Sequence, residues 1–149
     1  MHPIERVHLL AHADNLKPLR HLVKKLFNEQ GCNEKDLNSV IMAINEACMN
    51  VIQHAYNTED GEIIVDFLIN KDDLIVRIYD FSETVDTNVI KSRDLDDVRP
   101  GGIGVHLMNE VMDKVEYKTG MDGMGNLLEL TKKIISDNNK NLKNEEKKL

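Results

Sequence analysis

The sequence predicts an α+β two-layer sandwich, in which helices cover one face of a mixed, mostly antiparallel sheet. Three observations favour this fold class. Apolar residues recur at helical spacing in two segments between residues 15 and 55. Two pairs of β-rich runs follow, one on each side of a long polar segment. The resulting order is a strand, two helices, two strands, a connection, a helix and two strands, which suits helices packed on a single sheet.

The N-terminal part of the chain is expected to form one strand and two helices. Residues 4–11 mix apolar and polar side chains, which indicates the first strand. A first helix over 15–30 should end at Gly31, because glycine readily adopts the left-handed conformation that closes a helix. Asn33 can then cap a second helix that extends to about Ala55.

The rest of the domain is expected to contain four strands, a long loop and a third helix. The strands are expected at 63–69, 74–79, 115–118 and 127–135. Only a short polar turn separates the first two, which predicts an antiparallel hairpin. Residues 81–100 show little periodicity and are acidic, and a loop of this length is usually functional. The glycine-rich segment 101–104 opens the third helix.

Size and composition indicate one soluble domain. The 149 residues divide into a domain over 1–135 and a polar, Asn- and Lys-rich tail over 136–149 that is expected to be disordered. The net charge of −7, with no basic stripe before the tail, argues against a nucleic-acid partner. Two cysteines fit reduced thiols, and neither a signal peptide nor a membrane span is found, so a cytoplasmic protein without membrane contact is expected.

A polar stripe on the second helix is the first candidate site. Glu46, Asn50 and His54 lie four residues apart, which places all three on one side of a regular helix. A carboxylate can accept a proton, and an amide oxygen can ligate a hard cation. Two interpretations stay open at this point, a solvated polar edge and a catalytic face. For His54, a packed helix histidine explains the residue as well as a ligand contact does.

Asp80 is the second candidate, because it directly follows the apolar strand 74–79. A carboxylate at the end of a buried strand needs hydrogen-bond donors. An adenine amino group or an ordered water would supply them. The alternative is an aspartate that only turns the chain at the strand end.

The third candidate is the segment from Arg99 to Leu107, with its clustered glycines. Glycines at a helix start let backbone N–H groups approach an anion such as phosphate. The segment is neither a P-loop, since no Gly-Lys-Ser/Thr follows, nor a dinucleotide fingerprint, since no strand leads into it. A plain glycine-rich turn remains the alternative.

Together, these motifs resemble the nucleotide-binding domain shared by gyrase, heat-shock chaperones, histidine kinases and mismatch-repair ATPases. Within that superfamily, the chain is similar to the anti-sigma factor serine/threonine kinases. The motifs that carry the resemblance are Glu46–Asn50, His54–Tyr56, Gly101–Leu107 and Val111–Tyr117. It covers about residues 4–135 and implies a Bergerat-type ATP-binding fold.

The resemblance also implies roles for individual residues. Glu46 would be the general base that orients or deprotonates an attacking hydroxyl, and Asn50 would ligate Mg²⁺ on the ATP phosphates. Asp80 would accept a hydrogen bond from the adenine amino group. The backbone at Gly102 and Gly104 would wrap the phosphates behind a lid formed by the preceding loop. Arg99 is a further candidate phosphate contact, because of its charge and its place in that lid.

Two positions depart from the family pattern. After the adenine-binding aspartate the family usually has Asp-x-Gly, where this chain has Ser82. A serine lacks the backbone freedom of glycine and adds a Cβ near the nucleotide. Near the end of the domain the family often has Gly-Thr, where this chain has Gly125 and Asn126. Asparagine can still donate and accept around the adenine.

The resemblance implies a serine/threonine protein kinase that uses ATP and Mg²⁺ to phosphorylate a small anti-sigma-factor antagonist. It further implies sequestration of a sigma factor, partner switching and a homodimer. The competing hypothesis is a non-catalytic binding module, with or without nucleotide, and Ser82 is the residue that favours it.

Overall fold

A five-stranded sheet forms one layer of the molecule. The computed structural model describes residues 1–55, 61–82, 107–119 and 125–134. The strands are β1 (His2–Leu10), β2 (Glu62–Asn70), β3 (Asp73–Asp80), β4 (Lys114–Thr119) and β5 (Asn126–Lys133). They lie in the order β1-β2-β3-β5-β4, so that β5 is inserted between β3 and β4. The expected sheet is mixed and mostly antiparallel, and all four pairings among the described strands are antiparallel.

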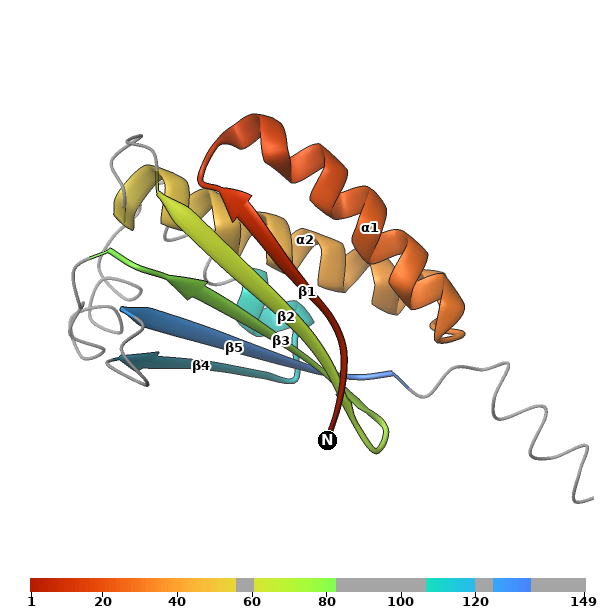
Figure 1. The fold of residues 1–149 in the computed structure, drawn as a ribbon. Coiled ribbons are helices and arrows are strands. Elements are labelled where there is room, and N and C mark those ends of the chain that lie inside the picture. Colours follow the sequence, from red (N-terminus) through yellow and green to blue (C-terminus); the bar gives the residue numbers. More distant parts are fainter. Residues whose placement is uncertain (56–60, 83–106, 120–124, 135–149) are drawn as a thin grey trace, which may run out of the picture.

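Two long helices form the second layer. α1 (Leu16–Glu29) follows a short 3-10 turn, η1 (Ala13–Asn15), and α2 (Glu34–Asn50) continues into a π-helical turn, η2 (Val51–Ala55). Figure 1 shows α1 and α2 lying on the same face of the sheet. Residues 107–111 add a short helical segment before β4. The predicted two-layer α+β fold class is confirmed.

Local sequence signals explain where the two long helices begin and end. Gly31 has a φ of 74°, a left-handed conformation that favours glycine. The N–H of Cys32 bonds to the carbonyl of Phe27, and the N–H of Gly31 bonds to that of Asn28, the Schellman pattern of a helix end. The Asn33 side chain accepts from the N–H of Asp36 at 2.8 Å and caps α2, as expected.

β2 and β3 form the predicted hairpin around a two-residue turn. Asn70 pairs with Asp73, which leaves Lys71 and Asp72 as the turn. Lys71 has a φ of 58°, in the left-handed region where most side chains are disfavoured. This register alternates the residues of both strands between the helix-covered face and the open face.

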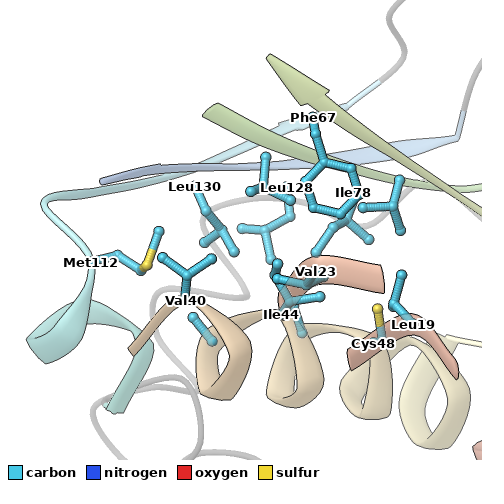
Figure 2. Close-up of a cluster of buried hydrophobic side chains, with 14 of the residues drawn as sticks. Leu19, Val23, Val40, Ile44, Cys48, Phe67, Ile78, Met112, Leu128 and Leu130 are labelled. Atoms are coloured by element: carbon cyan, nitrogen blue, oxygen red, sulfur yellow. The ribbon is translucent and has the colours of Figure 1, made fainter. Parts of the chain in front are cut away.

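The core lies between the helices and the sheet. Figure 2 shows Val23, Val40 and Ile44 of the helices directed at the sheet side chains. Phe67, Ile78, Leu128 and Leu130 face them from the central strands. Met108 of the helical segment 107–111 and Met112, which directly follows it, are buried in the same core.

The opposite face of the sheet carries a row of charged residues. Strand register places Arg6, Asp66, Arg77, Glu129 and Glu116 next to one another, one on each strand. Arg6 binds Asp66 through two hydrogen bonds of 2.6 and 2.7 Å, and Arg77 donates to Glu129 at 2.8 Å. Opposite charges therefore meet across neighbouring strands in most of the row, which stabilises this register.

Candidate functional site

The candidate site lies at one end of the molecule. In Figure 1 the C-terminal end of α2, the end of β3 and the start of β5 all lie at this end. Asp80 is the last residue of β3 and pairs with Asn126, the first residue of β5. Glu46 and Asn50 lie in the last two turns of α2. The fold thus gathers the two strand-end residues and the two helix residues in the same region.

Asp80 is a buried carboxylate with a dense set of donors. Only 6% of the residue is exposed. Its Oδ1 accepts from the Ser82 hydroxyl at 2.6 Å, from the Ser82 backbone N–H at 3.1 Å and from Asn126 Nδ2 at 2.9 Å. The bond from the backbone N–H two residues ahead is an Asx-turn contact, so Asp80 also turns the chain as the alternative interpretation expects.

All of these donors converge on the same oxygen of Asp80. Within the described part of the chain, no donor contacts Oδ2. An ionised carboxylate can only accept hydrogen bonds. Oδ2 is therefore suited to accept from a ligand amino group that approaches the end of the sheet.

Gly125 holds the two strand ends together. A Cβ at this position would lie 2.6 Å from the carbonyl oxygen of Ser82 and 3.0 Å from that of Asp80. The backbone of β5 can approach β3 this closely only because residue 125 has no side chain. The close approach brings the amide of Asn126 within reach of Asp80.

Glu46 and Asn50 are both partly exposed on α2. Their neighbours Ala47 and Cys48 are buried against the sheet, which fixes the rotation of the helix. In the described residues no hydrogen bond or ion pair engages the Glu46 carboxylate or the Asn50 amide. Both groups are therefore available to a bound ligand, as a base or a metal ligand must be.

Arg20 connects the two long helices. In the structure Arg20 is half-buried and donates to Asn45 Oδ1 at 2.7 Å, a contact between α1 and α2. This bond ties α1 to the residue directly before Glu46 on α2.

The predicted stripe on α2 changes geometry after Asn50. The expected helix does extend to Ala55, but Val51–Ala55 forms a π-helical turn. The regular four-residue spacing therefore applies to Glu46 and Asn50 and does not continue to position 54. The side chain of His54 lies outside the described part of the structure, and its role stays open.

Three of the predicted site residues lie outside the described ranges. Arg99, Gly102 and Gly104, with the glycine-rich segment and the expected lid, fall within 83–106. Their assignment to the phosphates stays a prediction. The tail 136–149 also lies outside the described residues.

The hydrogen-bonding role of Ser82 is the feature that the sequence did not reveal. From the sequence alone, serine at this position indicates only that the backbone freedom of glycine is lost. The structure shows in addition that the serine hydroxyl donates a hydrogen bond to Asp80. The available signal was the Asp-x-Ser spacing, because serine two residues after an aspartate commonly contacts the aspartate side chain in a turn.

Comparison with known proteins identifies the family. Residues 9–132 match the family described as the histidine kinase-like ATPase domain. This chain belongs to that family. The matched range includes Glu46, Asn50, Asp80 and Asn126, so the family match covers every described candidate residue. The resemblance predicted from the motifs is confirmed.

Among the family members, serine-protein kinases named RsbW are similar to this chain. The RsbW of Halalkalibacterium halodurans is 30% identical over 127 residues, which cover 80% of this chain and 76% of the relative. The RsbW of Bacillus cereus is 29% identical over 114 residues, which cover 71% of each protein. These relatives support a place for the chain in the anti-sigma factor kinase branch of the family.

A solved structure shares the fold. The RsbU and RsbW domains of Rv1364c from Mycobacterium tuberculosis align over 89% of this chain with a TM-score of 0.62 and 17% identity. The chain spans about a third of that structure, since the alignment covers 33% of it. At this identity the match shows the family fold.

Proposed function

We propose that this chain is an anti-sigma regulatory serine/threonine protein kinase. It binds ATP with Mg²⁺ and transfers the γ-phosphoryl group to a serine or threonine of a small anti-sigma-factor antagonist. The observation that carries the proposal is the buried Asp80: its Oδ1 accepts from three donors, while no donor of the described residues contacts Oδ2, the oxygen proposed to accept from an adenine amino group. The similarity to RsbW serine-protein kinases supports the choice of reaction.

The proposed reaction is a direct transfer between two bound substrates. The acceptor hydroxyl oxygen forms a bond to the γ-phosphorus, the bond from that phosphorus to the bridging oxygen breaks, and ADP leaves. Glu46 orients the hydroxyl and takes its proton. Because such transfer needs little covalent chemistry from the protein, positioning and charge neutralisation provide most of the catalysis.

Asn50 is the proposed protein ligand to Mg²⁺, through its amide oxygen. When bound, the ion neutralises phosphate charge. In the described ranges no group of three or more His, Cys, Asp and Glu residues is placed to hold a metal. Magnesium at phosphoryl-transfer sites needs only one or two protein ligands, because phosphates and waters complete its coordination. A single partly exposed amide therefore fits this role.

The remaining predicted contacts extend the same site. Arg99 and the backbone at Gly102 and Gly104 are proposed to hold the phosphates, and Asn126 to act near the adenine. In the part of the chain that the structure describes, no helix is long and apolar enough to cross a membrane. We place the kinase in the cytoplasm, without a nucleic-acid partner.

Regulation is proposed to occur through partner switching. The protein would bind a sigma factor in one state and the antagonist in another, and would act as a homodimer. The helix α1 is a candidate partner or dimer surface, and His21, Lys24 and Lys25 are exposed on it. The alternative interpretation of this surface is an ordinary solvated helix face.

Phosphoryl transfer tests the kinase assignment directly. The protein is incubated with labelled ATP and with candidate antagonist proteins that carry a serine or threonine acceptor. Label is expected on the acceptor, and Glu46→Ala should abolish it, because the variant lacks the carboxylate proposed to take the hydroxyl proton. Glu5→Ala, at an exposed position on β1, is the matched control and should transfer label normally.

The same experiment separates the kinase from its alternative, a non-catalytic partner-switching module. ATP binding without transfer to any cognate acceptor would reject the kinase and favour the module. Label that persists in the Glu46→Ala variant would remove Glu46 from the chemistry. The module is kept as the second candidate because Ser82 replaces the glycine that the family usually has two residues after the adenine-binding aspartate.

Calorimetry tests the role of Asn50. Asn50→Ala should weaken ATP binding about tenfold when Mg²⁺ is present, which corresponds to about 1.4 kcal/mol, because a ligand of the ion is lost. In the presence of a chelator the variant and the wild type should bind equally. Asn38→Ala, an exposed asparagine on the same helix, is the control. An unchanged Mg²⁺-dependent affinity would exclude Asn50 from the site.

A further inference from the structure

We propose that Ser82 and Asn126 are a positioning pair that sets nucleobase specificity through Asp80. The pair holds the carboxylate so that Oδ2 faces the 6-amino group of a purine, and so favours adenine over 6-oxo bases. This inference rests on the proposed function, because it concerns the same ATP site. It assigns a positive role to Ser82, the residue that departs from the family pattern.

Three side chains form a closed triangle of hydrogen bonds. Ser82 Oγ lies 2.6 Å from Asp80 Oδ1, Asn126 Nδ2 lies 2.9 Å from the same oxygen, and Asn126 Nδ2 lies 3.0 Å from Ser82 Oγ. Serine has one hydroxyl proton, and it is directed to the carboxylate. Seen from Asn126 Nδ2, Asp80 Oδ1 and Ser82 Oγ lie close together in direction, so one amide proton is shared between these two acceptors. Asn126 therefore restrains the carboxylate and the hydroxyl through the same N–H group.

This arrangement restricts the carboxylate of Asp80. Rotation about its side-chain bonds would break the contacts from the serine hydroxyl, the serine N–H and the Asn126 amide together. The short O–H···O distance of 2.6 Å is typical of a charge-assisted bond to an ionised carboxylate. The close approach at Gly125 also fixes the backbone of both partners. Oδ2 is thus held in one direction before a ligand arrives.

A fixed acceptor discriminates between purines. The 6-amino group of adenine donates a hydrogen bond to Oδ2, whereas the 6-oxo group of hypoxanthine would place two acceptors against each other. A binding site rejects the wrong partner strongly when a buried polar group is left unpaired. If the carboxylate were free to turn, it could move away from the oxo group and the discrimination would weaken.

The test compares ATP with ITP, which differs at the 6-position of the base. Dissociation constants are measured by calorimetry for the wild type, Ser82→Ala, Asn126→Ala, the double variant and Ser82→Thr. Ser82→Ala should lose about tenfold in ATP affinity, in the range of one hydrogen bond to a charged group, while its ITP affinity changes less than about twofold. Ser82→Thr keeps a hydroxyl and should restore the ATP preference.

A double-mutant cycle tests whether the two residues act together. Because each contacts both Asp80 and the other, the double variant should lose less ATP affinity than the sum of the single losses. Thermal unfolding without nucleotide identifies any variant that has lost its fold. If Ser82→Ala is such a variant, the ATP and ITP affinities of Ser82→Thr and Asn126→Ala are compared instead.

Several outcomes would overturn the inference. Equal losses for ATP and ITP would show that Ser82 only supports the local structure. Tighter ATP binding by Ser82→Ala would show that the hydroxyl competes with the nucleobase, and additive losses would show that the pair is not coupled. A wild type that binds no nucleotide would instead reject the proposed function, whereas an ATP-binding wild type with an unchanged ATP-to-ITP ratio in the variants rejects this inference alone.

Discussion

Gly125 shows how one residue without a side chain shapes the surroundings of Asp80. The backbone carbonyls of Asp80 and Ser82 occupy the space where a Cβ would be. Both obstacles are backbone atoms, so they cannot move aside as the end of a flexible side chain would. The contact between β3 and β5 at this point therefore depends on glycine.

Gly125→Ala is expected to damage stability and nucleotide binding together. The new methyl group must push the start of β5 away from β3, which separates Asn126 from Asp80. We expect a loss of about 1–3 kcal/mol in unfolding free energy, the usual range for forced overpacking, and weaker ATP binding. Urea unfolding and calorimetry measure the two effects. If Gly125→Ala had the same unfolding free energy and the same ATP affinity as the wild type, the ends of β3 and β5 would be able to separate without cost.

The sequence predicts some residues of the site better than others. Asp80 is predictable because an acid after an apolar strand needs a special environment, and the structure gives it three donors. The contact of Asn126 with Asp80 joins residues 46 positions apart, and it depends on a strand order that local patterns do not encode. The contact of Arg20 with Asn45 is not predictable for the same reason. Local patterns indicate where each helix lies in the sequence, but not how the two helices face each other.

At the scale of elements, turn chemistry explains which boundaries are predictable. Gly31 ends α1 as expected, because a left-handed residue is needed there. The hairpin register also follows from its short polar turn. The π-helical turn after Asn50 has no such signal, since Val51–Ala55 continues the apolar spacing of a regular helix. Strand ends differ from expectation by one to two residues, as for β5, which ends at Lys133 instead of residue 135.

Lys71→Gly is expected to stabilise the β2–β3 hairpin. Lys71 adopts a φ of 58°, where its Cβ is strained and glycine is not. The relief should raise the unfolding free energy by about 0.5–1 kcal/mol, after the greater freedom of glycine in the unfolded chain is included. Urea unfolding measures the change. Lys71→Ala keeps the strain and serves as the control, and an equal gain in both variants would contradict this explanation.

At the scale of the whole molecule, the two layers meet over a buried hydrophobic interface that includes Cys48. This thiol is fully buried between α2 and the sheet, and burial raises its pKa from 9.0 to about 12. In the unfolded chain the thiol would ionise near its ordinary pKa. The packing of the two layers is thus coupled to pH in the alkaline range.

The coupling predicts a loss of stability at high pH. Because the folded pKa is raised, the contribution of Cys48 is complete below about pH 9 and is lost as the pH rises toward 12. Over this window the unfolding free energy of the wild type should fall by about 1.4 kcal/mol per pH unit more steeply than that of Cys48→Ala. Urea titrations at several pH values test this, and parallel slopes for the two proteins would contradict it.

The strand order also has a consequence for the folding of the protein during translation. Asp80 and Ser82 are made early, but their partner Asn126 is made only after β4 and belongs to β5, the last strand among the described residues. A nascent chain that has completed β3 therefore carries the carboxylate proposed to recognise the base without the amide that orients it. Under the proposed function, the base can be recognised only after β5 is made, so ATP would assist only the nearly finished domain and not its intermediates.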